Sequence, residues 1–279
     1  MSALRYVYAI CRPFAAALSA ELAGVAGVPP KLLRHGDLIA VVGSVPEREF
    51  AAEPLRRRLE DVQWLEATAR AHQGVIDALT AVTSPLPLRL ATVLRDDSGV
   101  RVMMEERRED FLRTLDRLDG QVEWDVKVYA ENTETVGDSG TSETSGTSET
   151  SGISETNGNF GTSGTSGTSG TSGKTLERAD EFTRRLHGTL SRCAGETRLR
   201  TLPNPESAPS EVADIEVLDA AYLVPRAKSE EFVERVNGSA RDEPGVRVEL
   251  TGPWAAYSFT GSTGLTGFTG VTAFTRKAS

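Results

Sequence analysis

The stretch VEWDVKVY, residues 122–129, decides the fold that we predict for this chain. Its apolar residues occupy every second position and alternate with Glu123, Asp125 and Lys127. This two-residue period is typical of a β-strand with one buried and one exposed face. We therefore expect a strand over Val122–Tyr129 whose three charged side chains point outward.

The sequence that follows supplies the partners that such a strand needs. Apolar residues recur at three- and four-residue steps from Leu176 to Leu190 and again within 227–236, as on the buried face of a helix. Strand-like runs lie at Glu196–Leu202, Ile215–Val224 and Val246–Leu250. Together with residues 122–129, the predicted order is β-α-β-β-α-β, which is the ferredoxin-like pattern.

The first half of the chain also mixes the strand and helix periods. We expect strands at Leu4–Ile10, at Lys31–Leu33 and Leu38–Val42 around a hairpin turn, and at Leu88–Leu94. We expect helices over Pro54–Leu79, over Val100–Glu106 behind an Asp97 or Ser98 cap, and around Phe111–Leu118, ending at Gly120.

A low-complexity tract of Gly, Ser, Thr and Glu interrupts the second half. Its last part, GTSGTSGTSGTSG at 161–173, runs into Lys174-Thr175 and resembles the end of a phosphate-binding loop. That loop needs a glycine where Thr168 stands and a buried strand before it, so two of its three conditions fail. Because this composition buries too little apolar surface to offset its ordering entropy, we expect a disordered insertion over 133–173. The Thr-Gly-x tail, 260–279, is predicted to be low-complexity sequence as well.

Charge and cysteine content limit the classes of function. The formal net charge of −9 disfavours a nucleic-acid partner, since phosphate binding needs clustered Lys and Arg. No run approaches the ~18–20 apolar residues of a membrane span, and Arg5 interrupts the N-terminal run as a signal peptide. We expect a cytoplasmic protein without a disulfide framework, because Cys11 and Cys193 are its only cysteines.

Few side chains have a sequence context that indicates chemistry. His72 lies on the apolar stripe of the long predicted helix and is interpreted as a buried, hydrogen-bonded core residue. Cys11 is interpreted as a small buried residue, since no motif places a histidine or aspartate beside it. The adjacent Asp96 and Asp97 precede a Ser-Gly pair and favour a turn-and-cap role over an acid/base or metal pair. We predict no catalytic, cofactor-binding or metal site.

Aromatic residues near the end of the second half are the candidate partner contacts. Trp254, Tyr257 and Phe259 follow the Gly252-Pro253 turn. Buried aromatics often anchor protein–protein interfaces. The open alternative is that this segment is a packed edge of the second domain.

Six motifs occur in order over both halves and resemble one known family. They are YVYAI at 6–10, HGDLIAVV at 35–42, ARAH at 69–72, PLPLRLATVL at 85–94, VEWDVKVY at 122–129 and ELTGPWAAYSF at 249–259. They are similar to those of the gas vesicle proteins of the GvpL/GvpF family. The tract and the tail depart from the family pattern, and PLRLAT replaces the commoner PLRF-G-T.

The resemblance implies an α+β fold with two domains, both ferredoxin-like or modified ferredoxin-like. The N-terminal domain would span 1–120, and the C-terminal domain would span 121–259 and carry the insertion. Within the fourth motif, Arg89 is a charged residue in a predicted apolar strand, so we expect it to be paired with a carboxylate.

The resemblance also implies a function without catalysis or cofactor. It indicates an accessory protein of gas vesicle assembly, located at the gas vesicle, that binds the main shell protein GvpA and other accessory proteins. Three alternatives remain at this point. They are a ligand-binding regulatory module of ferredoxin-like fold, an RNA binder of the RRM type, which the acidic balance disfavours, and an enzyme built around Cys11 or the aspartate pair.

Overall fold

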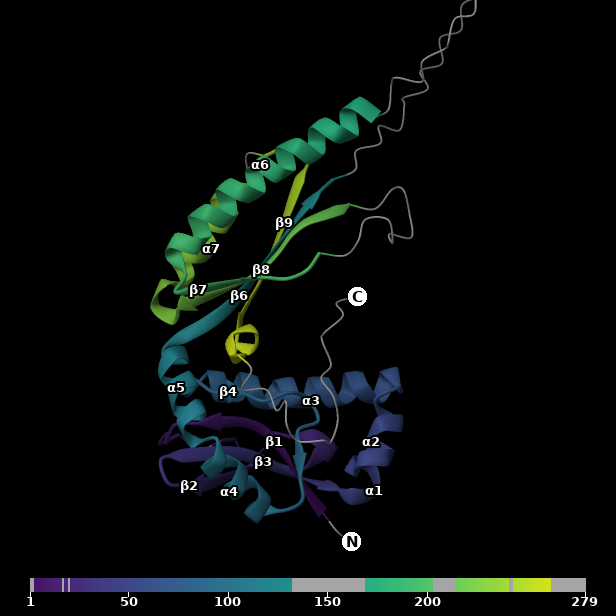
Figure 1. Ribbon diagram of the computed structural model, residues 1–279, viewed down its shortest axis with the longest axis vertical. Helices are drawn as coiled ribbons and strands as arrows, with labels where there is room; N and C mark the ends of the chain where they lie inside the picture. Colours follow the sequence, from purple (N-terminus) through teal and green to yellow (C-terminus); the bar gives the residue numbers. More distant parts are fainter. Residues whose placement is uncertain are drawn as a thin grey trace, which may run out of the picture.

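The structure, a computed structural model, describes residues 3–16, 18–19, 21–131, 169–202, 214–240 and 243–261. Two antiparallel sheets with their helices follow each other along the chain (Figure 1). The predicted tract, up to residue 168, and the tail beyond residue 261 lie outside the described residues. The described chain is thus a mixed α+β protein.

The elements of the first half are β1 (Ala3–Cys11), the 3₁₀ turn η1 (Val25–Gly27), β2 (Lys31–His35), β3 (Leu38–Pro46), α1 (Glu47–Phe50), α2 (Ala52–Arg58), α3 (Val62–Thr80), β4 (Leu86–Pro87), β5 (Val93–Leu94), α4 (Asp97–Glu106) and α5 (Arg108–Leu118). Those of the second half are β6 (Gln121–Ala130), α6 (Ser169–Cys193), β7 (Glu196–Leu199), β8 (Ile215–Pro225), the 3₁₀ turn η3 (Arg226–Lys228), α7 (Ser229–Ala240), β9 (Val246–Trp254) and the 3₁₀ turn η4 (Tyr257–Phe259).

The first sheet has helices on both faces. Its strand order is β2-β3-β1-β4, and β5 also pairs with β1. Tyr6 and Tyr8 of β1 belong to one buried cluster with Ile76 of α3, whereas Val7 belongs to another with Met103 of α4. Because neighbouring strand residues point to opposite faces, this division places α3 on one face and α4 on the other. In Figure 1, α3 lies on the side of the first sheet that faces the second half.

The second sheet has its helices on one face. Its strand order is β7-β8-β6-β9, and α6 and α7 cover the face that carries Trp124, Val126 and Val128 (Figure 1). Phe182 of α6 and Phe232 of α7 complete that buried cluster. The element order is the β-α-β-β-α-β order predicted from the sequence.

The two halves share a buried cluster. Leu223 of β8 and Phe259 of η4 are in the same cluster as Phe111 and Leu115 of α5. Leu223 lies on the face of the second sheet opposite the helices, and Phe259 follows that sheet's edge strand. Residues far apart in the sequence therefore complete one core between the halves.

The predicted long helix is in fact two helices. α2 ends at Arg58, and α3 begins at Val62 after an N-cap in which the Asp61 carboxylate accepts a hydrogen bond from the Trp64 N–H at 3.1 Å. The apolar stripe continues across the break, which is why the period alone did not reveal it. An aspartate that caps a helix satisfies a backbone donor that would otherwise lack a partner.

The predicted strand over Leu88–Leu94 is wrong, since β4 ends just before this range and only its last two residues form a strand, β5. Ala91 has a φ of 62°, which an L-residue rarely adopts and which turns the chain. The Ala91 N–H donates to the Tyr6 hydroxyl at 3.0 Å, and the Thr92 hydroxyl donates to the Arg89 carbonyl at 2.6 Å. These contacts with β1 and within the turn replace the expected strand pairing.

Two helix starts also differ from the prediction. α6 begins at Ser169, so residues 169–173 lie in a helix and not in the coil expected up to Gly173. α4 begins at Asp97, and its cap is Asp96, whose carboxylate accepts from the Gly99 N–H at 2.9 Å. The predicted caps, Asp97 and Ser98, are therefore one and two residues too late.

Candidate functional site

The three predicted contact residues lie where the second half meets the first. Trp254 is the last residue of β9, and Tyr257 and Phe259 belong to η4. Figure 1 shows η4 as the yellow turn between the second sheet and α3. We call Ala255–Phe259 the junction segment.

Phe259 is buried in the junction and does not lie on the surface, contrary to a role as an exposed anchor. Its side chain is 0% exposed. The Arg198 guanidinium lies over its ring, 5.6 Å from the centroid, and Arg117 donates a hydrogen bond to its carbonyl oxygen. The side chain fills the core that the halves share, so contact with a partner would require it to leave that core.

Tyr257 connects the junction segment to the first half through His72. Its hydroxyl lies 3.1 Å from His72 Nε2, and the Tyr6 hydroxyl lies 3.0 Å from His72 Nδ1. Since Tyr6 accepts from the Ala91 N–H, its own proton is available for Nδ1, which leaves the imidazole proton on Nε2 to donate to Tyr257. Burial lowers the pKa of His72 to about 4, which keeps the ring neutral at pH 7. The prediction of a buried, hydrogen-bonded His72 is confirmed.

Trp254, like Tyr257, keeps part of its surface accessible. It is half-buried, and its Nε1–H donates to the Thr251 hydroxyl at 3.4 Å. It lies on β9, an edge strand of the second sheet.

A partly buried ionic cluster, which we call the acidic cluster, lies on the face of the second sheet opposite its helices. It comprises Glu123 and Asp125 of β6, Asp219 of β8, Arg200 and Ser258. Arg200 donates to Glu123 at 3.1 Å, to Asp125 at 2.7 Å, to Asp219 at 2.9 Å and to the Ser258 hydroxyl at 2.9 Å. Glu123 also accepts from the Ser258 N–H at 2.8 Å, so the cluster fixes the junction segment to the sheet.

The acidic cluster is less exposed to solvent than the sequence predicts, and its pKa values are shifted. Glu123 was expected to point outward into solvent, but its residue surface is only 3% exposed because Arg200 and Ser258 cover it. Removal from water raises the pKa of Glu123 to about 7, against hydrogen bonds from Ser258, and the Asp125 charge adds to the rise. Lys127 pairs with Glu216 at 2.6 Å and with Asp219 at 3.1 Å; these bonds outweigh its partial burial and raise its pKa to about 12.

The sequence gives no sign of this cluster beyond the alternation of β6. Arg200 follows β7 and meets Glu123 from 77 positions away, and Ser258 meets it from 135 positions away. Only the pairing of β6 with β8 and β9 brings these three residues together.

Neither of the sequence candidates for chemistry has the geometry of a catalytic group. Cys11 is fully buried, and burial raises the pKa of its thiol to about 12. Asp96 caps α4, and Asp97 forms an ion pair with Arg5. Both aspartates are therefore occupied by structural contacts.

Arg89 is exposed and lies in the turn between β4 and β5, so the predicted pairing with a carboxylate is wrong. Within the described ranges it forms no ion pair with a carboxylate. The chain turns at this point instead of continuing as an apolar strand, which removes the reason for a partner.

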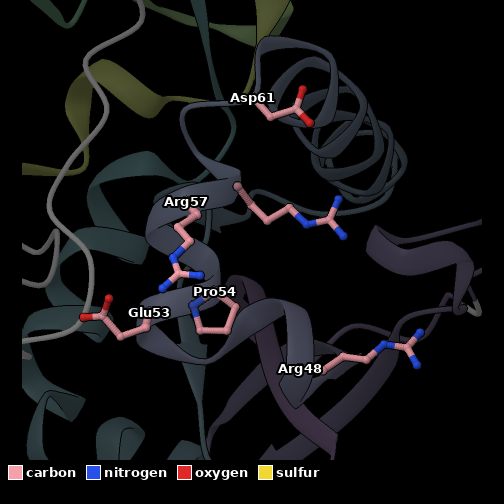
Figure 2. A pocket seen from close by; sticks show the side chains of 6 residues that line it. Arg48, Glu53, Pro54, Arg57 and Asp61 are labelled. Carbon is pink, nitrogen blue, oxygen red and sulfur yellow. The ribbon is translucent and has the colours of Figure 1, made fainter.

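A cleft beside α2 has a volume of about 540 Å³ (Figure 2). Its lining is charged: Arg48, Glu53, Pro54, Arg57, Arg58 and Asp61. Two of its arginines are held by acidic neighbours, since Arg48 and Arg58 both pair with Glu49. A single carboxylate thus serves two of the three arginines of the lining.

The described part of the chain has neither a cluster of metal ligands nor a membrane-spanning helix. No group of three or more His, Cys, Asp or Glu side chains there is arranged to hold a metal ion. No helix there combines the length and the apolar character that crossing a membrane requires.

Comparisons with known proteins identify gas vesicle proteins, and the family match extends over nearly the whole chain. The family model described as "Gas vesicle synthesis protein GvpL/GvpF" matches residues 4–261. Gas vesicle protein L of Streptomyces sp. (strain CB03234) is 50% identical over 259 residues, which cover 92% of this chain and 93% of that protein. Gas vesicle protein F of the same organism is 34% identical over 125 residues, covering 44% of this chain and 47% of that protein.

Two solved structures share the fold at low sequence identity. The crystal structure of the gas vesicle protein GvpF from Anabaena sp. PCC7120 has a TM-score of 0.62 and 15% identity, and the match covers 93% of this chain and 96% of that one. The crystal structure of the gas vesicle protein GvpF from Microcystis aeruginosa has a TM-score of 0.61 and 16% identity, and the match covers 92% of this chain and 98% of that one. Together with the family match across both halves, these likenesses lead to one conclusion: the chain belongs to the gas vesicle GvpL/GvpF family.

Proposed function

We propose that this protein is a non-enzymatic accessory factor of gas vesicle assembly that works at the gas vesicle in the cytoplasm. Its partners would be the main shell protein GvpA and other gas vesicle accessory proteins. The observation that carries the proposal is the 50% identity to gas vesicle protein L, which extends over both halves of the chain. A role in assembly requires contacts with other vesicle proteins and no cofactor.

We also propose that the chain has two domains, 1–120 and 121–259, the second ferredoxin-like and the first a modified version of that fold. The element order and the strand order β7-β8-β6-β9 support this for the second domain. In the first half, three strands precede the helices, which favours a modified arrangement. The shared core around Phe259 would then be the contact between domains.

Trp254 is the residue that we propose as a partner contact. It is half-buried at the end of an edge strand, so part of its ring is available to a partner while its position is fixed by the sheet. Tryptophan is enriched among the residues that dominate binding energies at interfaces. Phe259 would support this contact from inside the junction, and Tyr257, which is half-buried as well, would lie beside it.

The proposal is tested by capture of GvpA with the tagged full-length protein from cells that express the gas vesicle genes. Binding through apolar area should survive 1 M salt, where the screening length falls to ~3 Å and exposed ion pairs weaken. Trp254→Ala should reduce capture at least tenfold, which corresponds to ~1.4 kcal/mol.

Leu199→Ala is the matched control for this substitution. Leu199 is 63% exposed on β7, the opposite edge strand of the same sheet, so its loss should leave capture unchanged. Melting curves of both variants should match the wild type within a few degrees. Full capture by a folded Trp254→Ala variant would reject the contact residue. Normal vesicles in cells that lack this protein and its relatives would reject the function.

The ligand-binding alternative receives no support from a specific observation. The cleft beside α2 has a charged lining, and so does a second cleft lined by residues of α6, η3 and α7, whereas small-molecule sites are mostly apolar.

A further inference from the structure

The junction segment is held by two buried titratable groups of opposite charge type, one from each half of the protein. Tyr257 is bonded to His72 of α3, and the next residue, Ser258, is bonded to Glu123 of β6. His72 and Glu123 are each 3% exposed. A base from the first half and an acid from the second half thus act on adjacent residues.

The surroundings of His72 favour its neutral form. The titratable groups that face it are Tyr6 and Tyr8 of β1 and Tyr257 of η4, at ring centroid distances of 5.7, 5.6 and 6.3 Å. Among the described residues, no carboxylate forms a hydrogen bond or ion pair with it. A proton on His72 would place an uncompensated charge in this tyrosine cage and would remove the acceptor that Tyr6 uses.

The surroundings of Glu123 favour its neutral form for a different reason. Asp125 lies beside it on β6, and Asp219 of β8 binds the same guanidinium, so three carboxylates of the acidic cluster share Arg200. Lys127, the next charged residue on this face of β6, pairs with Asp219 and with Glu216, which lies outside the acidic cluster. At the outer edge, Arg117 and Arg198 are already paired with Glu196.

Ser258 allows Glu123 to bind the junction segment in both protonation states. Its hydroxyl lies 2.6 Å from Glu123 Oε1 and 2.9 Å from the Arg200 guanidinium, and its N–H lies 2.8 Å from Oε2. A neutral Glu123 donates its proton to the Ser258 oxygen, which also accepts from Arg200. An ionised Glu123 instead accepts the hydroxyl proton but adds a negative charge to an acidic, buried site.

We propose that His72 and Glu123 form an opposed pair of proton-dependent contacts, so that the junction segment stays attached with nearly constant strength in mildly acid and neutral conditions. Proton uptake by Glu123 strengthens the attachment. Proton uptake by His72 weakens it. Each contact alone would make the joint between the halves sensitive to pH, and together they compensate.

The signs follow from linkage. The folded-state pKa of Glu123 is raised to about 7, above its ordinary 4.5, so its contribution is fully present below pH 4.5 and is lost as pH rises to 7. The folded-state pKa of His72 is lowered to about 4 from 6.5, so its contribution is present above pH 6.5 and is lost as pH falls to 4. Between pH 4.5 and 6.5, the Glu123 contribution to stability falls as pH rises while the His72 contribution grows, so the two changes oppose each other.

The test is hydrogen exchange of the junction segment in the full-length protein, corrected for the intrinsic pH dependence of exchange. As pH falls from 6.5 to 4.5, the opening constant should rise by up to about tenfold per pH unit in Glu123→Gln and fall by a similar factor in His72→Gln. The wild type and the double variant should change less than about threefold over the same range. Glu234→Gln, an exposed carboxylate on α7, should follow the wild type.

The proposal would be overturned if the opening constants of the single variants changed with pH in the same way as that of the wild type. Because His72→Gln risks misfolding, titration of the wild type by NMR provides a second measurement. The Glu123 carboxyl carbon should titrate near neutrality, and the His72 ring should stay neutral down to pH 5. A Glu123 carboxylate that is ionised at pH 5.5, or a His72 that is protonated at pH 6, would equally overturn it.

Discussion

Replacing Phe259 by alanine should weaken the joint between the two halves. The side chain is fully buried in the cluster that contains Phe111 and Leu115 of α5 and Leu223 of β8. Phe→Ala in a core costs about 3–5 kcal/mol, the transfer free energy plus the cavity left behind. Loss of the Arg198 contact with the ring adds about 0.5 kcal/mol.

Urea unfolding is the assay, followed by tryptophan fluorescence. With a slope of about 3 kcal/mol/M, a loss of about 4 kcal/mol lowers the midpoint by roughly 1.3 M. Trp64 reports on the first half and Trp124 on the second, so paired Trp→Phe backgrounds separate the two signals. In Phe259→Ala both signals should shift, and their midpoints should move apart.

Phe232→Ala is the matched control, because Phe232 is equally buried but packs only within the second half. It should destabilise the second half by a similar amount and leave the Trp64 transition closer to the wild-type midpoint. If Phe259→Ala costs less than about 1 kcal/mol, or if it affects the second half alone, the shared core is not what joins the halves.

Three further predictions follow from the local contacts. Asp96→Ala should cost about 1 kcal/mol in the free energy of unfolding because it removes the N-cap of α4, whereas Ser98→Ala should stay within about 0.5 kcal/mol; equal losses in thermal melts would reject the cap assignment. Arg89→Leu should change stability by no more than about 0.5 kcal/mol, since the side chain is exposed, and a larger loss in the same melts would restore a buried partner for it. Iodoacetamide at pH 8 should modify the half-buried Cys193 before Cys11, whose thiol pKa burial raises to about 12; mass spectrometry of the labelled protein would contradict this if Cys11 reacted first.

Periodic patterns in the sequence were sufficient to predict an element where one of its faces is uniformly buried. The alternation in β6 predicts both the strand and its two faces, and the element order of the second half follows from the same reasoning. The break between α2 and α3 had a local signal in Asp61, a residue type that often caps helices and that here binds the Trp64 N–H. The apolar stripe continues across the break and concealed this signal.

Other features depend on contacts that no local pattern contains. The turn at Ala91 is fixed by the Tyr6 hydroxyl, 85 positions away, so an apolar run there resembled a strand. Glu123 has the outward direction that alternation predicts, yet it is buried because Arg200 and Ser258 cover it. Phe259 was a candidate partner contact with a packed edge as the open alternative, and the sequence could not decide between them because Arg117 of the first half, which binds its carbonyl oxygen, lies 142 positions earlier.

The position of the junction segment also bears on how the protein is made. Phe259 and the Arg117 side chain that binds its carbonyl are 142 positions apart. At ~5–20 residues per second, a ribosome takes roughly 7–30 s to add that length of chain. Until then, Phe111 and Leu115 lack one side of their core and expose apolar surface to water. The emerging first half is therefore a natural client for chaperones, and translation that stops before Ala255 would yield an aggregation-prone fragment.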